Sequence, residues 1–327
     1  MRVLVVNAGS SSLKLSVLDG EELVDEPADL ETALRAGPQA VGHRVVHGGD
    51  RTAAVVVDDA VLAELEGLTD LAPLHQPPAL RALRSARALL PDVPQVACFD
   101  TAFHTTLPEA ARTYALPARL RERLHVYGFH GLSHAWASAR AVPARRVVVA
   151  HLGSGSSLCA VLDGRSVDTT MGFTPTDGLV MGTRTGSLDP GAVAWLARAG
   201  EDLQQVLERE AGLRGLAGTS DMRELLARDD DEARLAVDVW LHRAVRLTGA
   251  MVAVLGGLDT LVFTGGVGEN AHELRARLCA RLEHLGVRHG QLDGEDATGE
   301  GSSVRVLVVH AREDLQIVRE VRELLGG

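Results

Sequence analysis

The segment VLVVNAGSSSLKLSVLDG, residues 3–20, occurs again in altered form as VVVAHLGSGSSLCAVLDG, residues 147–164. Aligned without a gap, the two copies share nine residues: two valines at the start, Gly-Ser-x-Ser in the middle and Val-Leu-Asp-Gly at the end. In each copy a run rich in β-branched residues leads into a polar Gly/Ser turn, and a second apolar run ends at Asp-Gly. This pattern is typical of a β-hairpin, so the repeat predicts a duplicated fold in which each half opens with a hairpin.

The two Gly/Ser turns are candidate anion-binding sites. Because glycine has no Cβ, the backbone N–H groups of such turns can converge on phosphate oxygens. Two turns at equivalent places in two domains could face each other, with phosphates between them. Lys14, the single lysine of the chain, follows the first turn, and its compact ammonium group suits a phosphate. The alternative is a surface lysine without a ligand.

The composition of the 327 residues limits the class of protein. With 46% hydrophobic residues the chain can fill two cores, and its length favours two domains. A net charge of −11 and 3% aromatic residues, without a basic run, argue against a nucleic-acid partner. No apolar run is long enough to span a bilayer, so we expect a cytoplasmic protein with no membrane partner. Cys98, Cys159 and Cys279 lack CxxC spacing and are expected to be core thiols.

A third glycine-rich segment, TGGVGEN at 264–270, follows the apolar run DTLVF and precedes a helical pattern. It lacks GxGxxG, and the chain has no GxxxxGK[ST] motif. We interpret the segment as a turn whose amides meet a nucleotide at a helix N-terminus.

Ten segments in this order resemble the acetate kinase family, which belongs to the acetate and sugar kinase, Hsp70 and actin superfamily. They are VNAGSSSLK, GHRVVHGG, LAPLHQPP, FDTAFH, YGFHGLSH, HLGSGSS, MGFTPTDGLVMGTRTGSLDPG, SDMR, FTGGVGEN and REDLQI. The resemblance implies an α/β protein with two duplicated ribonuclease H-like domains of the actin-like ATPase fold and a central cleft. It also implies a homodimer joined through the second domain. The first domain would comprise residues 1–102 and a returning helix at 314–327, and the second, nucleotide-binding and dimerisation domain would comprise residues 103–313.

The same resemblance implies reversible transfer of the γ-phosphoryl group of ATP to acetate, giving acetyl phosphate and ADP. Mg²⁺, or Mn²⁺ in its place, would be held by Asn7 and Glu313, since hard cations prefer oxygen ligands. The residues expected to bind the nucleotide are Ser10, Ser12, Lys14, His151, Leu152, Gly153, Ser154, Gly155, Asp221, Met222, Arg223, Gly266, Val267, Gly268, Glu269 and Asn270.

Four residues are expected at the reacting groups by position in the family's motifs. Arg44 and Arg184 would hold the carboxylate and the moving phosphoryl group, and His130 would donate to its equatorial oxygens, which is mainly electrostatic catalysis. Asp100 is the family's proposed acid or base. Acetate has no proton to remove at neutral pH, so Asp100 is more plausibly a residue that orients a magnesium-bound water or an arginine.

The acyl pocket implied by the family is apolar and narrow. Its matching positions are Val46, Leu74, Phe129 and Pro175. This set favours acetate and accommodates propionate, although each extra methylene would change preference only ~10- to 200-fold. Butyrate should be a poor substrate.

The sequence departs from the family in length and at two positions. Most of the missing length lies between Asp19 and Gly42, so part of the first sheet and its covering helix should be abbreviated. Ser154 replaces the usual Asn, which could weaken a phosphate contact, and Ser187 replaces the usual Asp.

Three alternatives remain open. A propionate or other short-chain acyl kinase is the first, and a nucleotide-binding module without turnover, as among actin and Hsp70 relatives, is the second. The joint presence of the metal-binding and catalytic residues named above argues against the second. The third is a zinc metallohydrolase, because the pairs His43/His47 and His130/His134 have the i, i+4 spacing of zinc helices, but neither pair includes the Glu of HExxH. His75, His104 and His134 are expected to be structural.

Overall fold

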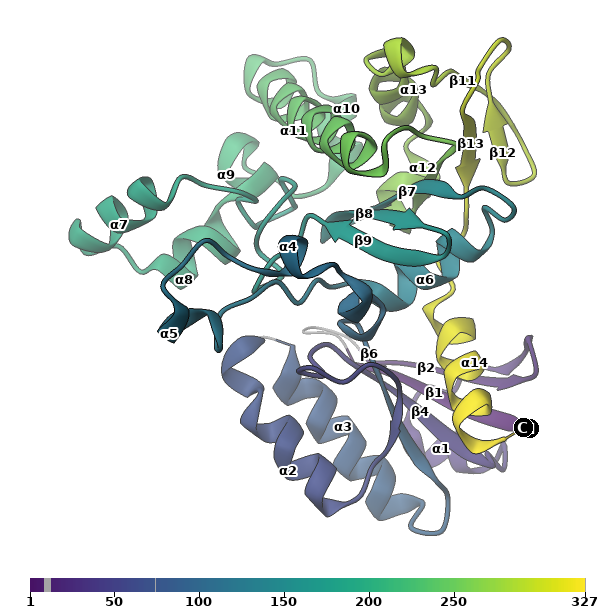
Figure 1. Ribbon diagram of the computed structural model, residues 1–327. Coiled ribbons are helices and arrows are strands. Elements are labelled where there is room, and N and C mark those ends of the chain that lie inside the picture. Colours follow the sequence, from purple (N-terminus) through teal and green to yellow (C-terminus); the bar gives the residue numbers. More distant parts are fainter. Residues whose placement is uncertain (9–12, 74, 327) are drawn as a thin grey trace. The chain divides into compact units, whose positions relative to one another are not determined.

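In a computed structural model of the protein, residues 1–8, 13–73 and 75–326 are described. The chain forms two compact units, shown in Figure 1. The first unit comprises Met1–Thr105, Phe129–Trp136 and Arg312–Gly327, and the second comprises Thr106–Gly128 and Ala137–Ala311. Helix α6 (Gly131–Ala139) is divided between the two units.

The first unit contains a six-stranded sheet in the order β3-β2-β1-β4-β6-β5. Its strands are β1 (Arg2–Ala8), β2 (Leu13–Asp19), β3 (Glu22–Asp25), β4 (Ala40–Val45), β5 (Val55–Val56) and β6 (Gln95–Phe99). The first three strands are antiparallel to one another, whereas β1, β4 and β6 are parallel. The central strand β1 is apolar on both faces, as expected for a strand covered on both sides.

Helices cover both faces of this sheet (Figure 1). They are α1 (Leu30–Leu34), α2 (Asp59–Gly67), α3 (Gln76–Leu89) and α14 (Glu313–Leu325). Leu4, Val6 and Val41 pack with α1 and α3. On the other face α14 lies directly against Gly42, where an added Cβ would be 2.4 Å from Ile317 Cγ2. Helix α14 therefore depends on the missing side chain at Gly42 for its close approach.

The second unit contains a seven-stranded sheet in the order β11-β12-β13-β10-β7-β8-β9. Its strands are β7 (Arg146–Leu152), β8 (Ser156–Leu162), β9 (Arg165–Thr169), β10 (Thr260–Thr264), β11 (His289–Asp293), β12 (Asp296–Thr298) and β13 (Arg305–Val308). Strands β7, β8 and β9 are antiparallel, and β7, β10 and β13 are parallel. The order β3-β2-β1-β4 of the first sheet corresponds to β9-β8-β7-β10 of the second, and a parallel strand follows in each, β6 or β13. This agreement confirms the predicted duplication.

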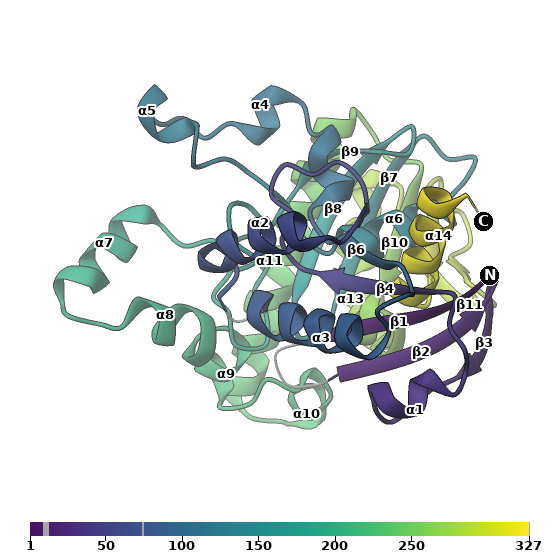
Figure 2. The ribbon, with the colours of Figure 1, turned by 90° about the horizontal axis from the view of Figure 1, so that it is seen from below.

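The second unit is rich in helices. They are α4 (Glu109–Arg112), α5 (Ala118–Arg121), α7 (Pro190–Arg198), α8 (Leu203–Gln205), a π-helix (Val206–Glu210), α9 (Gly212–Ala217), α10 (Met222–Ala227), α11 (Asp231–Leu255), α12 (Gly265–Asn270) and α13 (His272–Ala280). Helix α11 packs on the sheet and supplies much of the core. Figure 2 shows α7 and α8 lying away from the sheet of this unit.

Both predicted hairpins are present, but the connections between their strands differ in length by one residue. In the first, Ala8 pairs with Leu13, so residues 9–12 connect the strands. In the second, Leu152 pairs with Ser156, and only residues 153–155 lie between them. The gapless sequence alignment therefore conceals a turn that is one residue shorter in the second copy.

The short segment between Asp19 and Gly42 affects mainly a helix. Strands β2, β3 and β4 are all present in the first sheet. Helix α1 has five residues, whereas α11, between the third and fourth strands of the second unit, has 25. The three cysteines are free and buried, as predicted. Over the residues that the structure describes, no helix is both long and apolar enough to cross a membrane.

Candidate active site

Four predicted site residues meet at one edge of the first sheet. Asn7 lies near the end of β1, Arg44 near the end of β4, and Asp100 directly after β6. Because these three strands are parallel, their carboxyl ends share an edge, where ligands of α/β sheets bind. Glu313, the first residue of α14, completes the group.

Arg44 connects the members of this group. Its Nη2 donates to Asp100 Oδ2 at 2.6 Å and its Nε to Asp100 Oδ1 at 3.2 Å, while its Nη1 donates to Asn7 Oδ1 at 3.3 Å. Asn7 Nδ2 in turn donates to Glu313 Oε2 at 3.2 Å, and that oxygen lies 3.5 Å from Arg44 Nε. The guanidinium is therefore fixed by two carboxylates and one amide.

Burial and the neighbouring charges act in opposite directions on the pKa values of Asp100 and Arg44. It raises the pKa of Asp100 to about 6, although Arg44 acts in the opposite direction. Burial also disfavours the charge on Arg44, but Asp100 and Glu313 outweigh it and raise the pKa of Arg44. Both oxygens of Asp100 are already engaged as hydrogen-bond acceptors.

Lys14 lies beside this group. It is the direct partner of Asn7 in the β1–β2 ladder, and directly opposed residues of antiparallel strands project to the same face. The position of the single lysine next to Asn7 supports a role at a shared anionic ligand. Ser10 and Ser12 lie outside the described residues.

His130 occupies an unusual backbone position immediately before α6. Its φ is +57°, which is uncommon outside glycine and is a feature of functional sites. The next residue, Gly131, donates its N–H to Asp100 O at 2.8 Å, and a Cβ there would lie 2.2 Å from the same oxygen. The segment that contains His130 is therefore pinned to the backbone of Asp100.

Two residues of the predicted acyl pocket are buried in the first unit. Val46 is 5% exposed and Phe129 is 1% exposed. The Phe129 ring meets the His47 ring edge-on at 5.7 Å, and Phe129 O accepts from His104 Nε2 at 3.0 Å. Leu74 lies outside the described residues, and Pro175 belongs to the second unit.

His104 and Gln76 support this region, although the sequence identified neither as part of a site. Burial lowers the pKa of His104 to about 4, so its neutral ring donates to Phe129 O. Gln76 holds the backbone of His47 from both directions, accepting from His47 N at 3.1 Å and donating to His47 O at 3.0 Å.

In the second unit, two predicted nucleotide-binding segments lie side by side. Strands β7 and β10 pair as far as His151 and Thr264, so the turn Gly153–Gly155 and helix α12 follow neighbouring strand ends. A Cβ on Gly153 would be 3.9 Å from Gly266 N. Gly182 N donates to Ser154 O at 3.0 Å and ties the turn to the MGTRTG loop.

The segment 264–270 differs from the predicted turn, because Gly265–Asn270 is itself the short helix α12. At Gly265, whose φ is +78°, the chain passes directly from strand β10 into helix α12. A Cβ there would lie 2.8 Å from Leu152 O, so glycine is required.

Several side chains of these segments have partners within the second unit. Glu269 accepts from Ala311 N at 2.9 Å and contacts His310 Nδ1, and Asn270 Nδ2 donates to Gly266 O at 2.8 Å. Arg275, which the sequence did not suggest, donates to Gly268 O and Glu269 O, both at 2.7 Å. The side chains of Leu152 and Met222 belong to the core, and Val267 packs against it. Any contact that these three make with a nucleotide would come mainly from the backbone.

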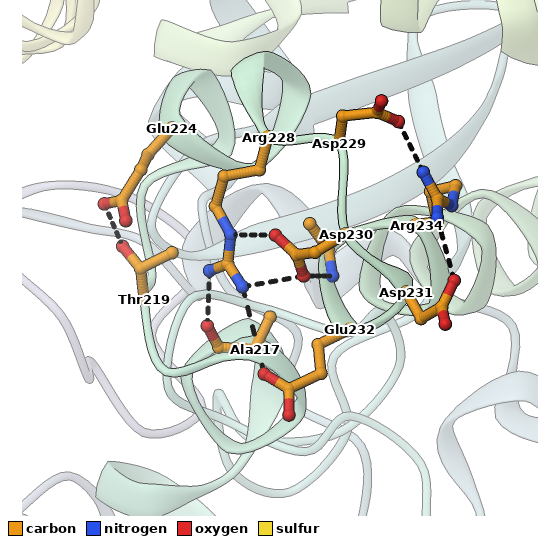
Figure 3. A network of polar contacts seen from close by, with 10 residues as sticks. Ala217, Thr219, Glu224, Arg228, Asp229, Asp230, Asp231, Glu232 and Arg234 are labelled. Carbon is orange, nitrogen blue, oxygen red and sulfur yellow. Dashed lines mark hydrogen bonds and ion pairs between the residues drawn. The ribbon is translucent and has the colours of Figure 1, made fainter.

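Asp221 is the N-cap of α10. It accepts from Arg223 N at 2.9 Å and from Arg223 Nη2 at 2.7 Å, and the Arg223 side chain lowers the pKa of Asp221 to about 2. Figure 3 shows the neighbouring network, in which Arg228 donates to Ala217 O and Asp230. This network joins the end of α9 to the start of α11.

Arg184 lies in the loop between Met181 and Ser187. Its Nη1 donates to Pro175 O. Burial lowers the pKa of Arg184, and the Glu208 carboxylate opposes that effect. Ser187, which replaces the usual Asp, donates to Asp177 Oδ1 at 2.7 Å and accepts from Gly178 N at 3.2 Å. With serine at position 187, the loop is therefore still hydrogen-bonded to Asp177 and Gly178.

Asn7 and Glu313 are suitable ligands for Mg²⁺. They offer an amide oxygen and a carboxylate in mutual contact, and Mg²⁺ typically takes one or two such groups and completes its shell with water and phosphate oxygens. No group of three or more His, Cys, Asp or Glu suited to a metal occurs among residues 1–8, 13–73 and 75–326. His43 lies in a strand and His130 precedes a helix, so neither histidine pair has the geometry of a zinc helix.

The duplicated strand order and the polar group at the carboxyl ends of parallel strands define the class of actin-like kinases and ATPases. The chain belongs to the acetokinase family, whose model matches residues 31–319. It is 41% identical over 395 aligned positions to the acetate kinase of Streptomyces avermitilis, covering 99% of this chain and 98% of that relative. The relative thus has segments that this shorter chain lacks.

Two solved structures agree along nearly the whole chain. An acetate kinase from Porphyromonas gingivalis superposes with a TM-score of 0.89 at 31% identity, covering 99% of each chain. A propionate kinase from Francisella tularensis superposes with a TM-score of 0.88 at 32% identity, covering 98% of each chain. The predicted family and fold are therefore confirmed.

Proposed function

We propose that the protein is an acetate kinase, which transfers the γ-phosphoryl group of ATP reversibly to acetate and forms acetyl phosphate and ADP. Membership of the acetokinase family supports this activity. The observation that carries the proposal is the position of Arg44, held between Asn7, Asp100 and Glu313 at the carboxyl ends of three parallel strands.

ATP would be bound by the glycine-rich turns and by the helix that follows β10. The turn Gly153–Gly155 and the start of α12 supply backbone N–H groups, which suit phosphate oxygens. Lys14 is next to Asn7 in the ladder, and we infer that it contacts the phosphates together with Ser10 and Ser12. Asp221, Met222 and Arg223 would contribute to the nucleotide site from the start of α10.

Mg²⁺ would be held by Asn7 and Glu313 and would neutralise phosphate charge when bound. Mn²⁺ has similar ligand preferences. Both protein oxygens also interact with Arg44. Metal binding would therefore be coupled to the orientation of that guanidinium.

Catalysis would be mainly electrostatic. Arg44, Arg184 and His130 would donate to the carboxylate and to the oxygens of the transferred group, whose charge is redistributed in the transition state. Asp100 needs no role as a base, because acetate is ionised at neutral pH. Its two contacts with Arg44 support a positioning role.

Propionate is the second candidate acceptor, because a propionate kinase shares the fold along nearly the whole chain. Val46, Phe129 and Pro175, together with Leu74, would form the narrow acyl pocket. Trapping the acyl phosphate with hydroxylamine in the presence of acetate, propionate or butyrate would rank the acceptors. We expect kcat/KM to be highest for acetate and lowest for butyrate; a preference for butyrate would contradict this pocket.

The catalytic proposal is tested by Arg44→Ala and Arg184→Ala. Each variant should lower turnover by orders of magnitude while ADP still binds, because the nucleotide contacts remain. Normal turnover in both variants would exclude the two arginines from catalysis. ADP binding by the native protein without acyl phosphate formation would instead favour a non-catalytic nucleotide-binding module.

We further infer a cytosolic homodimer. In this proposal the second domain binds the nucleotide and forms the dimer, and the first domain, with its returning helix, carries Arg44 and Asp100. Sedimentation would give the mass of the assembly. A monomer at assay concentrations would exclude the dimer without affecting the proposed activity.

A further inference from the structure

The loop that carries Arg184 rests on the carbonyl groups of the π-helix Val206–Glu210. Thr183 Oγ1 donates to Glu208 O at 2.8 Å, and Thr185 N donates to Leu207 O at 3.1 Å. These two bonds lie on either side of Arg184 in the sequence. The hydrogen bonds of Thr183 and Thr185 therefore help to fix the position of Arg184 between them.

The geometry of the π-helix makes these carbonyl groups available. The last carbonyls of any helix lack partners within the helix, and Leu207 and Glu208 belong to the final five residues before Ala211, which is extended. Single-turn π-helices are rare and frequently occur at functional sites. Here the otherwise unpaired acceptors face the MGTRTG loop and bind it.

Gly212, the first residue of α9, begins a second segment that contacts the same loop. The next two residues donate to it, Leu213 N to Met181 O at 2.9 Å and Arg214 N to Gly182 O at 3.0 Å. Gly212 has φ +64°, and a Cβ there would lie 2.3 Å from Met181 O and 2.8 Å from Arg184 O. Both the backbone angle and the close approach require glycine.

The guanidinium of Arg184 interacts with one residue outside this segment and with one residue in it. Its Nη1 donates to Pro175 O, and the carboxylate of Glu208 favours its charge. Glu208 thus provides a carbonyl for Thr183 and a charge for Arg184. The segment therefore holds the backbone beside the proposed catalytic arginine and supplies a carboxylate that opposes the effect of burial on its pKa.

We propose that Thr183 and Gly212 are positioning residues for Arg184, and that the segment Val206–Gly212 fixes the orientation in which this arginine meets the transferred phosphoryl group. The inference rests on the catalytic role proposed for Arg184. A purely structural role would stabilise the loop without altering the effect of Arg184 on the reaction. A double-mutant cycle distinguishes a positioning role from a purely structural one.

The cycle compares Thr183→Val, Arg184→Ala and the double variant, with Thr183→Ser as the matched control. Valine keeps the shape of threonine and removes the donor, whereas serine keeps the hydroxyl. Loss of one hydrogen bond predicts a decrease of about 5- to 10-fold in kcat for Thr183→Val. The KM for ATP should change less than about twofold, and Thr183→Ser should remain near the native rate. In the Arg184→Ala background, Thr183→Val should cause less than about a twofold further change, because the group that it orients is gone.

An equal loss in both backgrounds would overturn the proposal, as would a native rate for Thr183→Val. A native rate for Arg184→Ala would instead refute the catalytic role of the arginine, so the two failures are distinguishable. Gly212→Ala provides a second test, since a folded variant should lose kcat more than Thr183→Val does. If Gly212→Ala fails to fold, the double-mutant cycle of Thr183 and Arg184 alone decides.

Discussion

Both oxygens of the Asp100 carboxylate accept hydrogen bonds from Arg44, Oδ2 from Nη2 at 2.6 Å and Oδ1 from Nε at 3.2 Å. A guanidinium has five N–H groups in a fixed fork. With the bond to Asn7, three of them donate to residues that the structure describes. In that described part of the chain, one N–H on each terminal nitrogen is left to meet an anionic substrate. Asp100 therefore decides which edge of Arg44 remains available to a ligand.

Asp100→Asn should weaken catalysis while keeping a side chain of nearly the same size and shape. The variant loses a charge-assisted bidentate contact, and hydrogen bonds to charged groups are worth about 1.5–3 kcal/mol. We expect kcat to fall roughly 10- to 100-fold, measured by acyl phosphate formation at saturating ATP.

The matched control is Asp163→Asn, because Asp163 makes the same bidentate contact with Arg145 on the exposed surface, at 2.7 and 2.9 Å. Exposed pairs contribute little to stability. Its turnover should remain native. Equal turnover in both variants would show that Asp100 does not position a catalytic group.

Gly131→Ala should damage both stability and activity. The new Cβ would lie 2.2 Å from Asp100 O, in place of a hydrogen bond of 2.8 Å from Gly131 N. Overpacking of this kind typically costs about 1–3 kcal/mol, and it should displace Asp100 and His130 together. Thermal unfolding and kcat would be measured on the same preparations.

Gly249→Ala in α11 is the control for that substitution, since among the described residues no atom outside the adjacent helix backbone lies within 4 Å of its Cβ position. Alanine in a helix interior is favoured over glycine by about 0.5–1 kcal/mol. This variant should unfold at the same or a higher temperature. A native rate and native stability for Gly131→Ala would contradict the contact with Asp100.

Glu320 on α14 should give the protein a pH-dependent stability. Burial raises its pKa to about 7, with smaller opposing effects from Gln316 and Cys98 and supporting ones from Glu323 and Asp100. Its Oε2 is buried, and no group of the described residues forms a hydrogen bond with it. The folded protein thus keeps a proton that the unfolded chain releases near pH 4.5, so the free energy of unfolding should fall as pH rises from 4.5 to 7 and then level off.

The expected change across this window is on the order of 2–3 kcal/mol. Glu320→Gln should abolish it, because the amide does not titrate. Glu323→Gln, on the exposed side of the same helix, should retain most of it, because Glu323 contributes less to the raised pKa than burial does. Urea unfolding at pH 5, 6, 7 and 8 measures the effect. Unchanged pH dependence in Glu320→Gln would show that Glu320 does not carry a raised pKa.

The contacts of Arg228 in Figure 3 should stabilise the second unit more than the contacts of Arg234 do. Arg228 joins Ala217 O at 2.7 Å to both oxygens of Asp230, the residue that caps α11. Arg234 contacts only the exposed side chains of Asp229 and Asp231 among the residues drawn there. Arg228→Met should therefore lower the unfolding temperature more than Arg234→Met. The reverse order would mean that the carbonyl contact adds nothing.

The sequence alone determined the duplication, both hairpins, the buried cysteines and the family. These features depend on residues close together in the chain: alternating apolar runs, glycine turns and motifs of fixed spacing. It also identified Arg44, Asp100 and Arg184, but only as members of motifs.

Only the tertiary structure decided how those residues are held. Asn7, Arg44 and Asp100 meet because β1, β4 and β6 are parallel neighbours, an arrangement that links residues about 40 to 90 positions apart in sequence. The left-handed backbone of His130 and the π-helix under Arg184 likewise have no local sequence signature. Each depends on backbone groups contributed by distant segments, and the packing that pairs those groups is a property of the folded chain as a whole.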